Sequence, residues 1–366
     1  MKTNSLAVIL FTAAMALASC QDGDVRMHTI IHRDGKCVRE VSYSNVMSKE
    51  MRDSLWGSTN VQWSQPVPEC LNIDAFCSSS TEIGEGDTVT TTFSCPFRSV
   101  EEMCQHTPLL LNGTRLQSTA SLERHFRWFY TEYTFTEVFN CVGDTFKIAA
   151  TDYTDKDVVS FWFTGQPNLT EGLSGAEASQ KLSEMEPFVS KWLNDNLFNV
   201  CFDYIVSHYD SIPNPPVSRE RFTELHDSLA NYLLKDRDDL SDFKPKEGFQ
   251  QFFHSDAYTL FFDEETPCGK ELNDEFAKRL NILWFNVPYT LTMPGKVTDA
   301  GCGSMQGNVI FYPFTGERLI PHDYTITATS RVTHIWAYLL TFLIIALAAW
   351  SLRLKSRKSN FFSFRI

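Results

Sequence analysis

The feature that most constrains this 366-residue chain is an uncharged apolar run near its C-terminus, "IWAYLLTFLIIALAAWSL", residues 335–352. As a helix rising about 1.5 Å per residue, the run comes close to the roughly 30 Å hydrocarbon thickness of a bilayer. Trp336, Tyr338 and Trp350 lie near its ends, where aromatic side chains favour the membrane interface. The run therefore predicts a transmembrane helix at 335–352. A buried core helix is the alternative, but it fits poorly with the basic tail that follows directly.

The charges on either side of this run predict an orientation. Four basic residues, at 353, 355, 357 and 358, follow the apolar run, whereas only Arg331 and His334 precede it closely. Cytoplasmic flanks of membrane helices carry an excess of lysine and arginine. We therefore expect a basic cytoplasmic tail at 353–366 and an exported bulk of the chain.

The N-terminus reads as an export signal, with Lys2 ahead of a short apolar run at 6–18 that is too short to span a bilayer. Leu17-Ala18-Ser19-Cys20 resembles the bacterial lipobox, whose cysteine receives a diacylglycerol and becomes the mature N-terminus. The resemblance implies a signal peptide at 1–19, lipidation of Cys20 with a palmitate-type lipid, and a lipid anchor in the bilayer. Cleavage near Ser19, with Cys20 left as an ordinary cysteine, is the alternative.

Net charge narrows the class of partner. The chain has 32 Lys and Arg against 45 Asp and Glu; residues 21–332 hold 26 of the former and all 45 of the latter, a net charge of −19. So acidic a surface argues against nucleic acid or anionic lipid as the main partner.

The ten cysteines leave disulfide connectivity open. Export permits disulfides, and the pairs Cys70/Cys77 and Cys95/Cys104 are close enough in sequence to close small loops. Buried free thiols fit Cys141 and Cys201 at least as well as bridges do. The absence of a C-x-x-C motif removes the usual signals of a thioredoxin-like site and of a zinc knuckle.

Hydrophobic periodicity predicts an α+β fold. A β-rich exported region at 20–173 contains a hairpin at Asp34-Gly35 and strands at 87–95, 125–139, 144–153 and 158–164. Of these, 125–139 is so rich in aromatic residues that it reads as one strand buried on more than one face.

A helical insertion follows at 174–284. It has a capping-box pattern at Ser183 and Glu186, a helix N-cap at Ser218, and helices at 247–262 and 271–285. Strands then return at 285–332, and we expect strands from both ends of the chain to complete one sheet.

The last part of the exported region resembles a known group of proteins. "MPGKVTDAGCGSMQGNVIFYPF" followed by "DYTITATSRVTHIWAY" looks like the closing module of bacterial membrane lipoproteins similar in plan to the LppM-type lipoproteins of mycobacteria. "RWFYTEYTFTEVF" resembles strands of uncharacterised Bacteroidetes-type lipoproteins. The match covers roughly 60 residues and departs from the pattern at Phe311, where tryptophan is expected, and in the long helical insertion. The resemblance implies a β-rich envelope domain held at a membrane and no catalytic residues.

Few residues suggest chemistry. A two-residue turn at Asp34-Gly35 sets His32 opposite Cys37 with His28 on the same face, but four strand residues separate the histidines by about 13 Å, so an ordinary strand surface is favoured over a metal site. The motifs of P-loops, dinucleotide folds, zincins and serine hydrolases are absent, and nothing singles out a catalytic, cofactor-binding or metal-binding residue.

Four D-[ST]-apolar segments resemble the O-glycosylation acceptor of Bacteroidetes exported proteins, with acceptors Ser54, Thr88, Ser211 and Ser228. Ordinary turns and helix caps explain such dipeptides equally well.

Together these patterns predict a single-pass protein of the cytoplasmic (inner) membrane whose bulk faces the periplasm. The expected function is non-enzymatic binding or assembly with another envelope protein or a polymer. The alternative is an envelope hydrolase or processing factor with its site between the sheet and the helical lobe.

Overall fold

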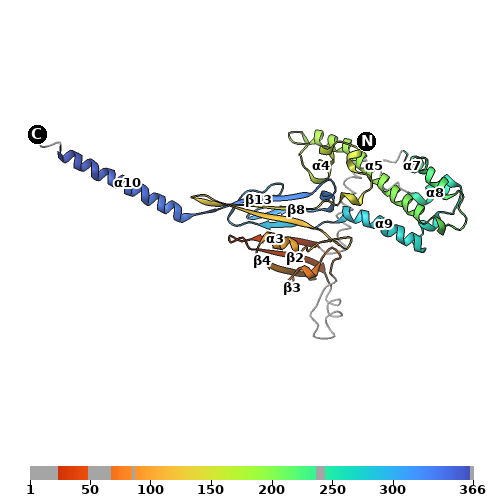
Figure 1. Ribbon diagram of the computed structural model, residues 1–366, viewed down its shortest axis with the longest axis horizontal. Helices are drawn as coiled ribbons and strands as arrows, with labels where there is room; N and C mark the ends of the chain where they lie inside the picture. The colour runs from red at the N-terminus through yellow and green to blue at the C-terminus, as the bar shows by residue number, and fades with distance from the viewer. Residues whose placement is uncertain (1–23, 48–66, 85–86, 236–243, 363–366) are drawn as a thin grey trace, which may run out of the picture.

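Two β-sheets lie face to face in the computed structural model, which describes residues 24–47, 67–84, 87–235 and 244–362, with side chains up to Arg353 (Figure 1). Among these residues, one sheet has seven strands in the order β11-β12-β9-β1-β2-β4-β3, and the other has four in the order β10-β13-β8-β7. The larger sheet contains β1 (Asp24–Ile31), β2 (Cys37–Val46), β3 (Ser78–Ile83), β4 (Thr88–Phe97), β9 (Tyr289–Thr292), β11 (Ser304–Gln306) and β12 (Val309–Tyr312). The smaller contains β7 (Ser118–Phe126), β8 (Tyr130–Phe139), β10 (Lys296–Asp299) and β13 (Tyr324–Thr333).

Strands from both ends of the chain pair with each other. β1 runs parallel to β9, with Met27 beside Tyr289, and β13 runs antiparallel to β8 along its whole length. The strands that follow the helical insertion therefore complete both sheets, not the one sheet that was expected.

The core between the sheets follows from strict alternation. Along β8, every second residue from Thr131 to Phe139 is buried, so a single face of that strand packs inward. The interpretation of 125–139 as one strand buried on more than one face is wrong, because β7 ends at Phe126 and a tight turn leads into β8. Its aromatic residues belong partly to the core and partly to the exposed turn.

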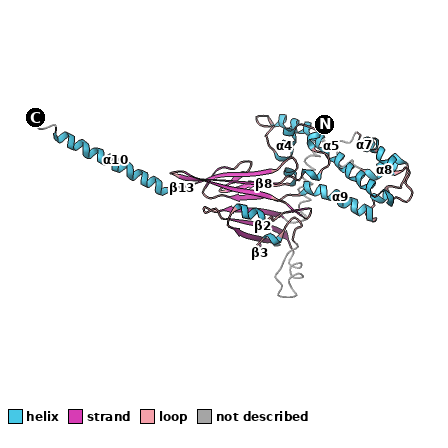
Figure 2. Ribbon diagram, in the orientation of Figure 1, coloured by secondary structure: helices cyan, strands magenta, loops and turns pink. Residues whose placement is uncertain are grey.

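The helices occupy the two ends of the sandwich, except α3 (Val100–Gln105), which packs against the strands and contributes Val100 and Met103 to the core. The others are α4 (Lys156–Thr164), α5 (Gly175–Ser207), α6 (Arg219–Glu224), α7 (His226–Leu234), α8 (Pro245–Phe253), α9 (Pro267–Trp284) and α10 (Ile335–Phe362). Short strands β5 (Leu110–Leu111) and β6 (Thr114–Arg115) form a small separate hairpin. Figures 1 and 2 show α4–α9 gathered as a lobe at one end, while α10 leaves the opposite end. The α+β prediction with a C-terminal apolar helix is confirmed.

Two predicted strands are helical. Residues 144–153 contain no strand but parts of two short 3-10 turns, Gly143–Thr145 and Ala150–Asp152. Residues 158–164 belong to α4, which is followed by Gly165 at a positive φ of 77°. Val159 and Phe163, four residues apart, are buried in a core with Trp192 of α5. This packing outweighs the strand preference of valine and phenylalanine.

The helix starts also differ from expectation. The capping box is formed by Ser174 and Glu177 and not by Ser183 and Glu186, and α5 continues through Pro187. The predicted helix at 247–262 ends at His254, which has a left-handed φ of 49°. The N-cap at Ser218 is confirmed, since its hydroxyl accepts from the Arg221 amide.

The disulfide differs from both suggested pairs. Cys77 is bonded to Cys95, and the register of β3 against β4 explains why, because Ser78 lies opposite Ser94 and the two cysteines follow one step further along. Cys201 is a buried free thiol, whereas the free thiol of Cys141 lies in an exposed residue.

Candidate functional site

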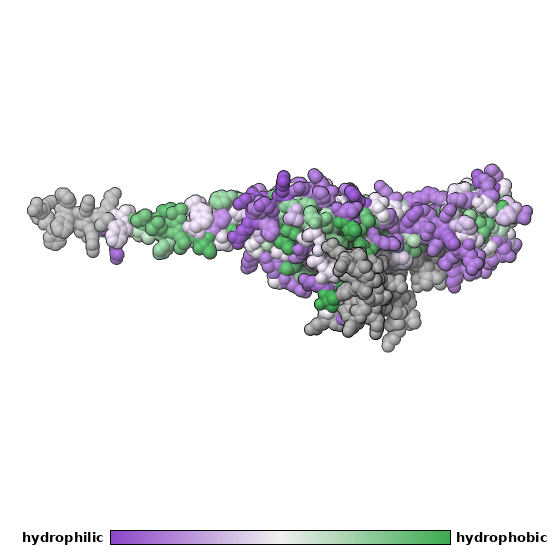
Figure 3. All heavy atoms as spheres, turned by 90° about the horizontal axis from the view of Figure 1, so that it is seen from below, coloured by the Kyte–Doolittle hydropathy of each residue, from purple (hydrophilic) through white to green (hydrophobic). Residues whose placement is uncertain are grey.

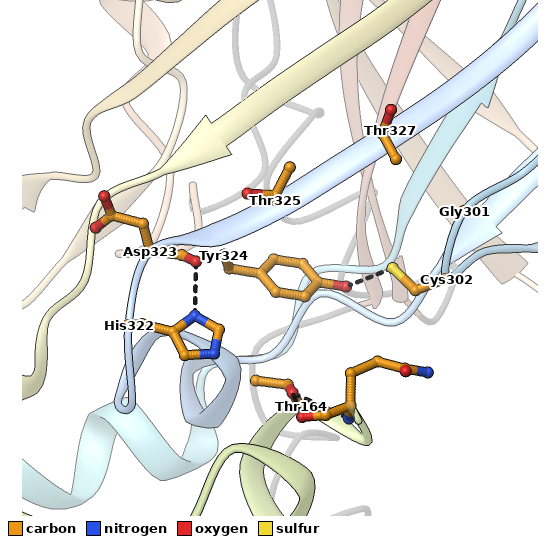
Figure 4. Close-up of a pocket in the computed structure, with 9 residues that line it drawn as sticks. Thr164, Gly301, Cys302, His322, Asp323, Tyr324, Thr325 and Thr327 are labelled. Carbon is orange, nitrogen blue, oxygen red and sulfur yellow. Dashed lines mark hydrogen bonds between the residues drawn. The ribbon is translucent and has the colours of Figure 1, made fainter. Parts of the chain in front are cut away.

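A cavity of about 390 Å³ lies where the helical lobe meets the sandwich (Figure 4). Its lining residues come from three segments: the end of α4 and the turn after it, the turn between β10 and β11, and the start of β13. They are Thr164, Gln166, Gly301, Cys302, His322, Asp323, Tyr324, Thr325 and Thr327. Its volume falls within the range of small-molecule sites, roughly 300–1,000 Å³.

His322 is held at one end of the cavity by its two ring nitrogens. Nε2 lies 3.0 Å from the Ser160 hydroxyl, and Nδ1 lies 2.8 Å from the main-chain oxygen of Asp323. The Ser160 hydroxyl donates to the Gln166 carbonyl oxygen at 2.6 Å. Because this hydroxyl hydrogen is directed at the carbonyl oxygen and not at His322, Ser160 holds the cavity wall together and is not activated as a nucleophile.

Tyr324 forms the cavity floor between two other groups. Its hydroxyl lies 3.6 Å from the Cys302 sulfur, and the Arg318 guanidinium lies 5.5 Å from its ring centre. The same guanidinium donates to the Thr164 carbonyl oxygen at 2.6 Å, which ties α4 to this wall. Burial raises the pKa of the Tyr324 phenol, so the hydroxyl stays protonated at neutral pH.

The arrangement suits binding better than catalysis. Figure 4 shows His322 and Cys302 at opposite ends of the cavity, with the Tyr324 ring between them, so the thiol has no adjacent base. The Gln166 amide and the Thr325 hydroxyl bond no other group among the described residues, and both line the cavity. They are available to a small polar ligand.

A second unusual cluster lies deep between the sheets. Arg39 of β2 donates from Nη2 to Glu137 Oε2 of β8 at 2.7 Å, and the two side chains are 2% and 0% exposed. Tyr289 and Ser118 also donate to the Glu137 carboxylate, at 2.8 and 3.0 Å. Burial raises the pKa of the neighbouring Cys104 thiol to about 12, so it remains a neutral neighbour.

Sequence reasoning missed this cluster, although a signal was present. Arg39 occupies the inward position between Cys37 and Val41 on β2, and Glu137 does so between Phe135 and Phe139 on β8. A charged residue in the buried register of each of two strands predicts a paired charge in the core.

The proposed alignment of His28, His32 and Cys37 is wrong. The hairpin has a three-residue loop closed by Gly35 at φ 90°, so Ile31 lies opposite Cys37. This one-residue shift turns Cys37 into the core and leaves His32 exposed. No group of three or more metal-ligand side chains occurs among the described residues.

The proposed modification sites are dispersed. Ser211 and Ser228 are exposed on the lobe, and Thr88 is half-buried at the start of β4. Cys20 and Ser54 lie outside the described residues, as do the signal peptide and most of the segment between β2 and β3.

The fold is thus a two-sheet sandwich with a helical lobe and one helix, α10, that is long and apolar enough to cross a membrane. The stretch Ile335–Arg353 of this helix is apolar and is almost entirely exposed. Comparisons with protein-family models, curated proteins and solved structures each find no match for this chain.

Proposed function

We propose that this is a single-pass envelope lipoprotein that binds or assembles with another macromolecule and performs no catalysis. The observation that carries the proposal is that two features lie at opposite ends of the sandwich: α10 leaves one end, and the helical lobe lies at the other (Figure 1). An exported domain anchored by α10 would hold the lobe away from the membrane. The cytoplasmic membrane and a cytoplasmic C-terminus are favoured by the basic residues after position 352.

The lobe also concentrates the negative charge of the chain. Residues 174–284 contain 11 Lys and Arg against 21 Asp and Glu, a net charge of −10, and the whole chain has −13. Asp210 and Asp227 are examples, with side chains 92% and 94% exposed. A partner with a basic surface, either an envelope protein or a cationic polymer, is the one that this field attracts.

Site-specific photo-crosslinking in intact cells tests this function. A photoreactive phenylalanine analogue replaces Tyr232, a 47% exposed aromatic residue of α7, and in a matched control it replaces Ile83, which is 54% exposed on edge strand β3. We expect one reproducible crosslinked partner from position 232 and none from 83. Equal crosslinking from both positions, or none from the lobe, would contradict the proposal.

The cavity supports a second candidate, an envelope hydrolase or processing factor. It lies at the junction of sheet and lobe, and His322 and Cys302 are its reactive groups. If this candidate holds, His322→Ala abolishes turnover of an envelope substrate by the purified full chain while the folded structure is retained. Unchanged turnover in both His322→Ala and Cys302→Ser would exclude this cavity as the catalytic site.

A further inference from the structure

The β7–β8 hairpin tip, residues 126–129, lies directly against the first turns of α10. The His334 amide donates to the Phe129 carbonyl oxygen at 2.8 Å, immediately before the helix begins. Ala337, within the first helical turn, is 0% exposed, whereas most other residues of the apolar run are exposed. The tip therefore packs beside the apolar helix itself, past the end of β13 and alongside the first turns of α10.

Aromatic rings form this contact. Phe129 packs on Tyr338 with ring centres 4.6 Å apart, and Trp128 meets Trp336 edge-on at 5.5 Å. His334 stacks on Phe126 at 5.2 Å. Tryptophan and tyrosine are the residues enriched where a protein crosses the membrane–water interface.

Two polar side chains at this contact, those of Trp128 and His334, are paired within the protein. The Trp128 indole donates from Nε1 to the Thr341 hydroxyl at 2.9 Å, and the His334 ring lies 2.9 Å from the Thr131 hydroxyl. Thr341 is six residues beyond Ile335, or about 9 Å along the helix axis. Such pairing is needed where a polar group lies beside lipid, because no water is present there to satisfy it.

Although its inner side packs on α10, the outer side of the tip is exposed and apolar. Phe126 is 61% exposed and Trp128 is 44% exposed, beside Trp336 at 50%. Figure 3 shows the green apolar surface of α10 running up to a sandwich that is mostly purple and hydrophilic. Because this apolar patch is continuous with α10, the medium that surrounds the helix also reaches the tip.

The charge of the tip is opposite to that of the domain. Arg124 and Arg127 are exposed at the end of β7 and in the turn, and neither forms an ion pair with a described residue. Basic side chains at this level lie where they meet lipid phosphates.

We propose that residues 126–129 insert into the membrane interface beside α10 and make the sandwich a second, peripheral contact with the bilayer. Lipid covers Phe126 and Trp128, and Arg127 lies among the headgroups. The contact fixes how the domain stands on the membrane. It depends on α10 spanning a bilayer but not on what the helical lobe binds.

Fluorine NMR of the full chain in lipid nanodiscs tests the insertion. The protein carries 5-fluorotryptophan, and Trp128→Phe assigns the Trp128 resonance. Lipids spin-labelled near the headgroup end of the acyl chain, or a soluble gadolinium chelate, are then added separately. Trp284 of α9 is the matched control, because its exposure, 49%, is close to the 44% of Trp128.

We expect spin-labelled lipid to broaden Trp128 several-fold more than Trp284, and the soluble chelate to broaden Trp284 more than Trp128. Trp336 provides the positive control for lipid contact. If Trp128 responds to the chelate as Trp284 does and not to the lipid, the insertion is refuted even when Trp336 shows that α10 is embedded. Protection of Trp128 from both agents would also overturn it, since protein and not lipid would then cover the tip.

Discussion

Arg39 and Glu137 are the charged side chains most completely buried among the described residues. Each comes from a different sheet, so their bond also connects the two layers of the sandwich. Removing water from two charges costs several kcal/mol per ion, and the attraction between them offsets this only when the geometry is good. Tyr289 and Ser118 complete the carboxylate's partners, whereas Arg39 Nε has no partner. The pair therefore contributes to how the sheets align more than to net stability.

We predict that Glu137→Gln lowers the free energy of unfolding by about 3–5 kcal/mol, because Arg39 is then buried without a counter-charge. Glu132→Gln is the control: Glu132 lies on the same strand and pairs with Arg331, but at the surface, so its loss costs about 1 kcal/mol or less. Urea denaturation measures both. The double variant Arg39→Met, Glu137→Leu should recover most of the loss, and equal losses for the two single variants would show that the buried charge is unimportant.

Glu317, half-buried before Arg318, provides a prediction on pH. Burial raises the pKa of its carboxyl above 4.5 despite the attraction of Arg318. The folded state thus binds more protons than the unfolded state as the carboxyl titrates, and the free energy of unfolding falls as pH rises through the folded pKa. Glu317→Gln should therefore raise the melting temperature at pH 7 and have little effect near pH 3.

Glu275→Gln should act in the opposite direction. Lys278 and Arg279 lower the pKa of Glu275, so its stabilising effect is present at neutral pH and is lost as pH falls. Melting temperatures of both variants across pH 3–8 check the pair of signs, and a loss of stability at neutral pH in Glu317→Gln would contradict the first.

Among the strands, edge strand β3 depends on a disulfide to stay paired with the larger sheet. All six of its residues are exposed, so it buries little apolar surface against the core. Cys77 immediately precedes it and is bonded to Cys95 of β4, 18 residues along the chain. A closed loop of this length stabilises a fold by about 3 kcal/mol through restriction of the unfolded chain.

The double variant Cys77→Ser, Cys95→Ser should lose about this amount of stability, and amide exchange should become fast in β3 before any other strand of the larger sheet. Cys201→Ser, which changes a buried free thiol of the lobe, is the control, because it should leave exchange in β3 unchanged. Unaltered exchange in β3 of the double variant would show that hydrogen bonds to β4 suffice.

How far the elements could be predicted depends on what determines each one. β13, Ser218 as an N-cap and the apolar helix at 335–352 are set by local signals, so periodicity and capping found them. α4 is set by contact with Trp192 of α5, which no local pattern contains. Asp34-Gly35 correctly predicted a turn, but the length of the loop decides the strand register. The loop is one residue longer than expected, and this difference moves Cys37 to the other face of the sheet.

The cavity illustrates the same limit at the site. Its walls come from segments near positions 164, 301 and 324, far apart in the sequence. Nothing in the isolated segments marks Gln166 or Thr325 as polar groups left without a partner. The alternative function drawn from the sequence did place a site at the junction of sheet and lobe, but only the packing of α4 against the 3-10 turn Gly316–Leu319, which precedes β13, brings these residues together.

For the whole molecule, strand direction bears on the two predicted anchors. β1 is parallel to β9, which follows the lobe helix α9, so Asp24 lies at the lobe end of the sandwich. The other end of β1 leads to Arg33, whose carbonyl oxygen accepts from Tyr133 near the α10 end of β8. The eight residues of β1 extend about 26 Å along this axis.

Cys20 lies outside the described residues, but Asp24 is only four positions further along the sequence, and an extended chain covers at most about 14 Å over four positions. A lipid on Cys20 would therefore fall short of the bilayer that holds α10 while β1 stays paired. We predict that the two anchors do not share one membrane in the folded protein.

Deletion of residues 335–366 with Cys20 intact should accordingly release the chain from the membrane fraction that holds the full-length protein, into the soluble fraction or a different membrane. Cys20→Ala in the full chain should leave its fractionation unchanged, because α10 alone anchors it there. Mass spectrometry of the released chain shows whether Cys20 carries a lipid. A lipidated full-length chain that stays in that membrane when a protease cuts it at a site placed just before α10 would contradict the prediction. The Cys20 lipid would then already have been in the bilayer that holds α10, and β1 would have had to leave its place between β2 and β9.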